Sequence, residues 1–363
     1  MPQHKQSNEK VLVAMSGGVD SSVAAALLLE EGYDVTGVFL CLKAPGQTNV
    51  ASTSRACCSP TDAADARRVA NVLGIRLIRH SVSDAFEPII RNFAAEYARG
   101  RTPNPCIHCN TEIKSARLLR LANALGPDYK YIATGHHARI ALRDGLPAIL
   151  RGLNTAKDQS YALFGIPGDL LGRILLPVGE LDNKEHVRQI ARRMHLPIHD
   201  KPDSQEVCFI PNDDYVGLLR TRAPEALRCG DIVASDGRLL GRHDGYGRFT
   251  IGQRRGIGVA ADEPFYVTRI DPATATVTVG PRDEVMSAHL TASGANWHCD
   301  VDSQFEATVQ IRYNHRGEKG LVRILDETSF EVTFAQPVSA ITPGQAAVVY
   351  WDGRLLGGGW IED

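Results

Sequence analysis

The sequence lacks the long apolar runs that membrane-spanning segments need. In its 363 residues no apolar stretch approaches the ~20 residues with which a helix crosses a bilayer. The first ten residues, MPQHKQSNEK, lack the apolar core of a secretory signal. We therefore expect a cytoplasmic protein with no membrane contact. In that setting the eight cysteines are expected to be catalytic, metal-binding or buried, and not a disulfide framework.

A strong excess of one charge is also missing, as are internal repeats and low-complexity segments. The formal net charge of −2 excludes a histone-like polycation, but local basic patches can still bind RNA. With 43% hydrophobic and 23% charged residues, the composition is that of a soluble globular protein. A chain of this length is expected to hold two or three domains.

A glycine- and serine-rich loop, Ser16-Gly17-Gly18-Val19-Asp20-Ser21-Ser22, is the most informative feature present. It separates an apolar run at 11–15 from an alanine- and leucine-rich stretch at 23–31, which predicts a strand, a tight turn and a helix. Glycines allow the close approach of an anion, and the N–H groups that begin a helix attract negative charge. We interpret the loop as a phosphate site that lacks the Walker lysine. The alternative is an ordinary glycine-rich turn.

Alternating strand and helix patterns continue to about residue 210. Strands are predicted at 35–40, 75–78 and 131–134, and helices at 60–73, 84–99 and 111–125. Strands separated by such helices form a parallel α/β sheet, which binds ligands at the carboxyl ends of its strands. Gly135 and His136 follow the strand that ends at Thr134, so we expect them at this edge. Lys157-Asp158-Gln159-Ser160 lies at a predicted helix start and is equally compatible with a solvated turn.

The remainder of the chain is rich in short alternating strands with frequent Gly, Asp and Pro, which is typical of small antiparallel barrels or sandwiches. The predicted domains are 1–210, 211–281 and 282–363. Within 238–255, five arginines are interleaved with Tyr246 and Phe249. Such a segment can follow a phosphate backbone while its rings stack on bases, and a solvated loop is the alternative.

Three cysteines are candidates for chemistry. Cys106-Ile107-His108-Cys109 precedes a predicted helix, and a thiol at a helix N-terminus has a lowered pKa, so Cys109 is a candidate thiolate. The pair is open to four interpretations: half of a zinc site, a redox pair, nucleophilic sulfur chemistry with a distant partner, or a structural role. Cys208 is the candidate partner. It lies in a predicted short strand, where the local pattern alone favours a buried hydrophobe.

Ordered motifs along nearly the whole chain resemble the tRNA-specific 2-thiouridylases, which use ATP to replace the C2 oxygen of the wobble uridine by sulfur. The motifs are AMSGGVDSS at 14–22, CCSPTDAADAR at 57–67, GRTPNPCIHCN at 100–110, ATGHHAR at 133–139, KDQSYAL at 157–163, FTIGQRRGIG at 249–258, RYNHRG at 312–317 and ITPGQAAVVY at 341–350. The resemblance implies a Rossmann-like α/β domain of the adenine nucleotide α-hydrolase type with a helical tRNA-contacting extension. A small central β domain and a C-terminal β-barrel are implied to follow.

The resemblance also implies a mechanism and a set of site residues. The uridine C2 oxygen attacks the α-phosphate of ATP, pyrophosphate leaves, and Mg²⁺ neutralises its charge with Asp20 as a contributor. Cys208 carries a persulfide sulfur from a donor protein, and Cys109 helps to release it, which leaves a transient Cys109–Cys208 disulfide for a reductant to reopen. The implied ATP-binding residues are Ala14, Met15, Ser16, Gly17, Gly18, Val19, Asp20, Ser21, Leu40 and Gly135. The implied contacts to a tRNA with U34 are Asn104, Pro105 and Cys106 at the target base, and His136, Lys157, Asp158, Gln159, Arg312, Tyr313 and Gln345 elsewhere.

One position departs from part of the family. Some members have an aspartate, assigned to proton transfer, where this chain has Cys106, and a thiol is a weaker base at neutral pH. The presence of Cys106 together with Cys109 and Cys208 suggests a second mechanism, based on a [4Fe–4S] cluster with one iron open to bind sulfide. The chain is also compatible with a different PP-loop ATP pyrophosphatase, and with an RNA-binding module that holds a structural metal on Cys106 and Cys109. We expect the protein to act as a monomer.

Overall fold

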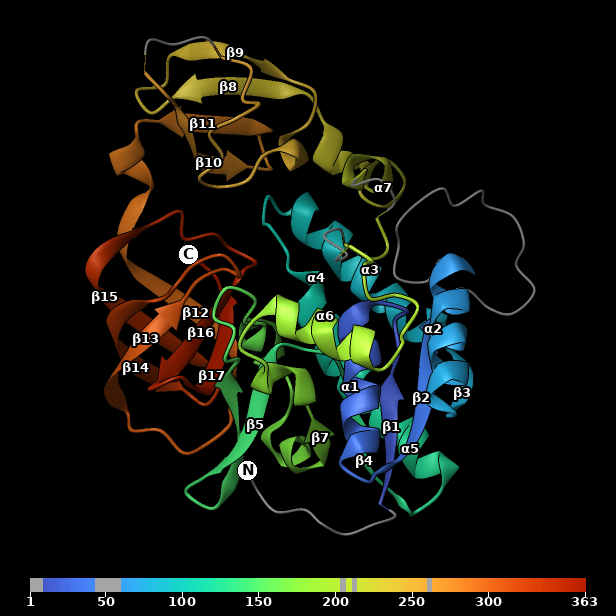
Figure 1. Cartoon of the computed structure of the whole chain (residues 1–363). Helices are drawn as coiled ribbons and strands as arrows, with labels where there is room; N and C mark the ends of the chain where they lie inside the picture. Colours follow the sequence, from blue (N-terminus) through green and yellow to red (C-terminus); the bar gives the residue numbers. More distant parts are fainter. Residues whose placement is uncertain (1–8, 43–59, 203–206, 211–213, 260–262) are drawn as a thin grey trace. The chain divides into compact units, whose positions relative to one another are not determined.

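The computed structural model describes residues 9–42, 60–202, 207–210, 214–259 and 263–363, which belong to two compact units (Figure 1). The first unit consists of Met1–Pro88, Cys106–Asp213 and Gly353–Leu355. The second consists of Ile89–Pro105, Asp214–Asp352 and Leu356–Asp363. None of the helices in the described ranges is long and apolar enough to cross a membrane.

The first unit contains a fully parallel sheet with the strand order β3-β2-β1-β4-β7. The strands are β1 (Lys10–Ala14), β2 (Asp34–Cys41), β3 (Arg76–Ser81), β4 (Tyr129–Ala133) and β7 (Ile174–Leu175). The chain moves outward from β1 to β3 and then returns to place β4 on the other side of β1. Ligands bind in such sheets at the carboxyl ends of the strands that flank this reversal. The predicted Rossmann-like sheet is confirmed.

Helices cover both faces of this sheet. Residues of α1 (Val19–Glu30), α2 (Pro60–Leu73) and α6 (Lys184–Arg193) form one core with Val11 and Val13 of β1. Leu12 is also fully buried, and it faces the other side because side chains alternate along a strand. There α5 (Leu118–Leu125) packs against β1 and β4. Burial on both faces explains why β1 is a continuous apolar run.

A single helical segment carries two of the candidate cysteines. It comprises α4 (Pro105–His108), a π-helix η1 (Cys109–Arg117) and then α5. The predicted start near Thr111 is wrong, because the helix begins at Pro105, whose fixed φ suits the first helical position. Inside the π-helix the Ser115 hydroxyl donates to the Asn110 carbonyl, five residues earlier, at 2.9 Å. π-Helices are rare and often occur at functional sites.

The first unit holds further elements that the sequence patterns did not reveal. A hairpin of β5 (Ala138–Arg143) and β6 (Leu146–Arg151) turns at Asp144 and Gly145, which both have positive φ, as a type I′ turn requires. The 3₁₀ turns η2 (Ser160–Leu163), η3 (Gly168–Arg173) and η4 (Pro177–Glu180) also belong to this unit. The helix predicted at 84–99 is present as α3 (Ser83–Ala98), which continues into the second unit.

The second unit contains a four-stranded sheet in the order β10-β11-β8-β9. Its strands are β8 (Gly230–Ala234), β9 (Leu239–His243), β10 (Tyr266–Asp271) and β11 (Thr276–Gly280), accompanied by α7 (Tyr215–Arg222), η6 (Pro224–Leu227) and η7 (Tyr246–Arg248). Tyr246 and Phe249 lie in the core of this part, at 2% and 5% exposure. The Tyr246 hydroxyl donates to the Ala98 carbonyl at 2.7 Å. The prediction that these two rings stack on bases is therefore wrong.

Six antiparallel strands then close into a barrel, in the order β12-β15-β14-β13-β16-β17 with β17 pairing back to β12. They are β12 (Met286–Trp297), β13 (Gln304–Gln310), β14 (Glu318–Asp326), β15 (Ser329–Ser339), β16 (Ala346–Trp351) and β17 (Arg354–Ile361), preceded by η8 (Arg282–Val285). Strand β17 also pairs with β6, so the β5–β6 hairpin extends the same sheet beyond the closed barrel. The barrel interior is filled by apolar residues such as Val309, Phe330 and Val349. The predicted C-terminal barrel is confirmed.

Candidate active site

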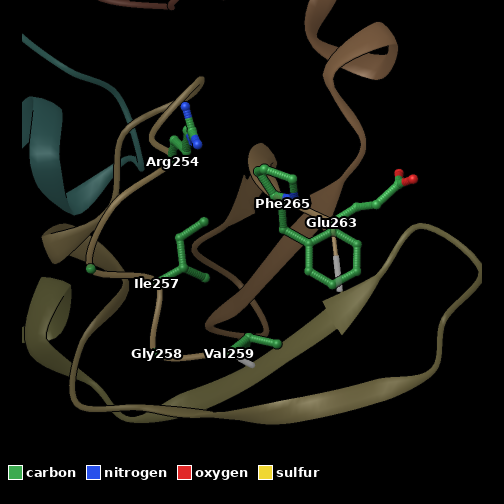
Figure 2. A pocket seen from close by; sticks show the side chains of 8 residues that line it. Arg254, Ile257, Gly258, Val259, Glu263 and Phe265 are labelled. Carbon is green, nitrogen blue, oxygen red and sulfur yellow. The ribbon is translucent and has the colours of Figure 1, made fainter. Parts of the chain in front are cut away.

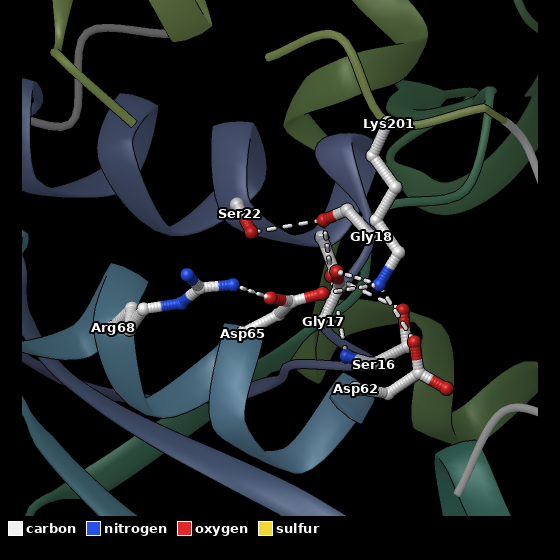
Figure 3. Close-up of polar contacts among 9 residues, drawn as sticks. Ser16, Gly17, Gly18, Ser22, Asp62, Asp65, Arg68 and Lys201 are labelled. Carbon is white, nitrogen blue, oxygen red and sulfur yellow. Dashed lines mark hydrogen bonds and ion pairs between the residues drawn. The ribbon is translucent and has the colours of Figure 1, made fainter. Parts of the chain in front are cut away.

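The loop after β1 leads directly into α1 at the carboxyl edge of the sheet. Gly18 is the N-cap of α1 in an extended conformation, and no side chain caps the helix there. The Ser22 and Ser21 hydroxyls instead donate to the Gly18 carbonyl, at 2.8 and 3.1 Å (Figure 3). The first N–H groups of a twelve-residue helix therefore remain available to an anion.

Two glycines hold this loop against its neighbours. Gly17 has φ +79°, and a Cβ added there would lie 2.3 Å from the Asp62 carbonyl oxygen of α2. A Cβ on Gly135, just after β4, would lie 2.5 Å from the Ser21 nitrogen. Strand β4 thus ends in direct backbone contact with the start of α1. The structure brings Gly135 to the loop, as the sequence indicated.

An ionised carboxylate stands at the start of α1. Lys184 Nζ donates to Asp20 Oδ1 at 2.6 Å, and His137 Nε2 lies 3.4 Å from the same oxygen. Burial on its own raises the pKa of Asp20, but the contact with His137 and the charge of Lys184 outweigh it and hold this pKa below its ordinary value. The sequence patterns missed Lys184, because its partner lies 164 residues away.

The motif at 157–160 is fixed by one side chain. Both carboxylate oxygens of Asp158 accept hydrogen bonds, from the Gly152 and Ser160 N–H groups, the Ser160 hydroxyl and Arg151, at 2.8–3.1 Å. The next side chain, Gln159, accepts from the His137 N–H at 2.9 Å. The motif is thereby attached to the segment that follows β4.

His136 lies in that same segment and is held neutral. Its Nδ1 is 2.7 Å from the Thr134 hydroxyl. Burial, together with the nearby positive charge of Lys114, lowers the pKa of His136 well below 6.5. At neutral pH the ring therefore offers a hydrogen-bonding edge and not a positive charge.

The three candidate cysteines all belong to the first unit. Cys106 is exposed, and Cys109 and Cys208 are half-buried. Cys109 lies in the second turn of its helical segment, so its predicted place at a helix N-terminus is wrong. No group of three or more His, Cys, Asp or Glu residues in the described ranges is arranged to hold a metal ion.

Cys208 lies in a turn, so the predicted strand is wrong. The Ile210 N–H donates to the Val207 carbonyl at 2.9 Å and closes this turn around Cys208 and Phe209. The Phe209 ring packs edge-on against Phe86, with ring centroids 5.8 Å apart. The apolar neighbours of Cys208 therefore anchor a turn, and this explains why they resemble a short buried strand.

The remaining predicted tRNA contacts belong to the second unit. Arg312 donates to the Ser339 carbonyl at 2.8 Å, and Gln345 donates to the Thr102 carbonyl at 2.8 Å, two residues before Asn104. Tyr313 is 42% exposed, so its ring is accessible, unlike that of Tyr246.

A pocket of about 190 Å³ lies in the arginine-containing part of this unit, and its lining includes Arg254, Ile257, Glu263 and Phe265 (Figure 2). Among the described residues that line it, Arg254 is basic and Glu263 is acidic, so these residues give it no excess of positive charge for a phosphate.

Comparison with known proteins gives the class of this chain. Residues 9–212 match the family model described as tRNA methyl transferase HUP domain. Residues 218–281 match the tRNA methyl transferase PRC-barrel domain, and residues 287–361 the aminomethyltransferase β-barrel domain. The parallel sheet and its uncapped glycine loop therefore belong to a HUP domain within a three-part chain.

Relatives that are similar over their full length define the family. The chain is 47% identical to the tRNA-specific 2-thiouridylase MnmA of Carboxydothermus hydrogenoformans, over 98% of both chains. It is 46% identical to MnmA of Salinibacter ruber, over 98% of this chain and 94% of that one. It is 44% identical to MnmA of Syntrophotalea carbinolica, over 98% and 99%. The chain belongs to the tRNA-specific 2-thiouridylase family.

Proposed function

We propose that this protein is a tRNA sulfurtransferase that uses ATP to replace the C2 oxygen of the wobble uridine, U34, by sulfur. Family membership supports the reaction. The observation that carries the proposal for this chain is that two kinds of site belong to its first unit. That unit contains an uncapped loop-to-helix site for phosphate together with Cys109 and Cys208. An enzyme that only cleaved ATP would need neither cysteine.

The first step activates the uridine. The C2 oxygen attacks the α-phosphate of ATP, the bond between the α- and β-phosphates breaks, and pyrophosphate leaves. The uncapped N–H groups of α1 stabilise the phosphate charge, and the contact of Gly135 with Ser21 keeps that part of the loop in place. Ala14, Met15, Ser16, Val19 and Leu40 complete the nucleotide site in this proposal.

The second step transfers sulfur. The terminal sulfur of a Cys208 persulfide attacks C2, a C–S bond forms, and the C–O bond breaks with release of AMP. Cys109 thiolate then attacks Cys208 Sγ, which breaks the S–S bond and leaves sulfur on the uridine. The two cysteines are oxidised to a disulfide, and a dithiol reductant restores them. The persulfide comes from a separate sulfur-donor protein.

The donor set at the loop fits Mg²⁺ better than an iron–sulfur cluster. Mg²⁺ is usually bound through one or two carboxylates and the substrate phosphates, and Asp20 is an ionised carboxylate at the helix start. The ion would neutralise the developing charge on pyrophosphate. Cys106, Cys109 and Cys208 do not form a metal-binding group within the described residues, so we derive no step through a cluster.

Residues from both units contribute to tRNA binding in this proposal. In the first unit, Lys157 supplies positive charge and His136 supplies a neutral ring. Asp158 and Gln159 hold the segments that carry these two side chains. In the second unit, the exposed Tyr313 is suited to stacking on a base, while Arg312 and Gln345 shape the neighbouring turns. Asn104, Pro105 and Cys106 would line the target base. We further propose domain boundaries at 210 and 281.

Transfer of labelled persulfide sulfur to tRNA in vitro tests the proposal. We expect tRNA- and ATP-dependent release of pyrophosphate and formation of 2-thiouridine. Cys208→Ser should abolish sulfur transfer while adenylation continues. Cys109→Ser should leave the tRNA joined to Cys208 through the transferred sulfur. The buried Cys41→Ser is the matched control, with wild-type transfer. Full turnover by Cys208→Ser would refute the persulfide route, and colourless, iron-free, fully active protein would refute the cluster mechanism.

A further inference from the structure

One lysine connects three segments of the first unit. Lys201 Nζ donates to the Gly17 carbonyl at 3.0 Å, to Asp62 Oδ1 at 2.6 Å and to Asp65 Oδ2 at 2.6 Å (Figure 3). An ammonium group has three N–H donors, so these oxygens satisfy all of them. The partners lie 136–184 residues from Lys201 along the chain, and no local sequence pattern reveals them.

The surroundings make this more than a surface ion pair. The Asp65 side chain is 6% exposed and the Lys201 side chain 25%. Arg68 also bonds to Asp65, so two cations balance the two carboxylates of α2. Burial alone raises the pKa of Asp65, but the hydrogen bonds from Lys201 and Arg68 outweigh it and keep this pKa low. Breaking one member of such a partly buried set leaves the others unbalanced.

The bond to Gly17 fixes the orientation of a loop peptide. In a trans peptide the C=O and N–H groups point in opposite directions. When Lys201 holds the Gly17 carbonyl, the Gly18 N–H points away from the lysine. Gly17 cannot move closer to α2 to compensate, because its backbone already lies against the Asp62 carbonyl. Lys201 therefore controls the direction of an N–H group in the loop that precedes α1.

Lys201 also stands seven residues before Cys208 in the chain. The residue whose side chain is bonded to the nucleotide loop is therefore close in sequence to the sulfur-transfer cysteine. We propose that Lys201 is a positioning residue that keeps the loop in its phosphate-binding conformation and couples nucleotide binding to the Cys208 segment. The inference rests on the proposed function, in which the two sites act in succession.

Two measurements on the full-length protein test the inference. The first is the Kd of a non-hydrolysable ATP analogue by calorimetry. The second is the rate of Cys208 alkylation by iodoacetamide, resolved by peptide mass spectrometry, with and without saturating analogue. In Lys201→Met we expect roughly 10- to 100-fold weaker binding, as for the loss of a hydrogen bond to a charged group. We also expect a Cys208 rate that responds to the analogue in the wild type and no longer responds in the variant.

Further variants separate positioning from general stability. Lys201→Arg keeps the charge and should recover part of the affinity and of the Cys208 response. Asp62→Asn keeps an amide oxygen as acceptor but removes one of the two carboxylate charges bonded to Lys201. It should show a smaller change in the same direction and serves if Lys201→Met does not fold. Lys130→Met alters an exposed lysine of the same unit and should match the wild type.

Wild-type affinity in a folded Lys201→Met would overturn the inference, and so would a Cys208 rate that still follows nucleotide in that variant. Neither measurement needs tRNA or a sulfur donor. Failure of the proposed thiolation would therefore appear separately, in the nucleosides of the tRNA.

Discussion

Substitution of Gly135 by alanine is the sharpest structural test of the nucleotide site. The added Cβ would lie 2.5 Å from the Ser21 nitrogen, 2.6 Å from the Asp20 carbonyl carbon and 2.8 Å from the Ser21 Cα. All three are backbone atoms at the start of α1, so no side-chain rotation can relieve the contacts. Carbon atoms pack at about 3.5–4.0 Å, so β4 and α1 must separate by roughly 1 Å.

The expected cost follows from this overlap. Overpacking of a well-packed site costs about 1–3 kcal/mol, which corresponds to roughly 5- to 150-fold in affinity if the loop bears the strain. A domain with a typical stability of about 5–15 kcal/mol remains folded under that load. We therefore expect Gly135→Ala to bind a non-hydrolysable ATP analogue at least fivefold more weakly, while its far-UV circular dichroism is unchanged.

Calorimetric titration of the variant with the analogue checks this prediction. Gly241→Ala is a matched control in the second unit, because among the described residues a Cβ there meets only Val259 Cγ2, at 3.9 Å. It should bind the analogue like the wild type. If Gly135→Ala also bound with wild-type affinity, the close contact between the end of β4 and the loop would have no part in the nucleotide site.

Three further predictions concern side chains away from the loop backbone. Asp65→Asn should lower stability by about 1–3 kcal/mol at pH 7. The folded pKa of Asp65 lies below its unfolded value near 3.9, so the extra stability of the wild type is present above that pH and is lost as the pH falls through the folded pKa. Urea unfolding of both proteins from pH 7 to 3 checks this. Equal stability of the two proteins at every pH would contradict it. Tyr246→Phe should lower the free energy of unfolding by about 1 kcal/mol without weakening tRNA binding. Tyr313→Ala should weaken tRNA binding by about 1–3 kcal/mol at unchanged stability. A filter-binding assay in which Tyr246→Phe weakened tRNA binding more than Tyr313→Ala would refute both assignments. Asp158→Ala removes the carboxylate that pairs with Arg151 and should destabilise the protein by about 3 kcal/mol in the same unfolding assay. A change under about 1 kcal/mol would rule out the central position of Asp158 in the motif.

Local patterns in the sequence were enough for the parallel sheet and its loop. The strand at 11–15, the glycine turn and the following helix are each specified by residues adjacent in sequence, and Gly135 was placed correctly because all parallel strands present their carboxyl ends at one edge. The barrel was likewise visible as short alternating strands.

Features that depend on distant partners were not visible. Lys184 and Lys201 acquire their roles from carboxylates more than 130 residues away. Tyr246 and Phe249 stand among arginines in sequence, but the fold turns both rings into the core. The π-helix at Cys109 and the turn at Cys208 also lack a periodic signature. In a run as short as 207–210, a buried turn and a buried strand have the same composition.

The central claim is that Cys208 delivers sulfur to uridine in tRNA, and nucleoside mass spectrometry tests it most directly. The tRNA is taken from cells that lack this protein and from the same cells supplied with the wild type or with Cys208→Ser. We expect 2-thiouridine to be absent without the protein, to return with the wild type and to stay absent with the variant. Undiminished 2-thiouridine in the cells that lack the protein would contradict the claim.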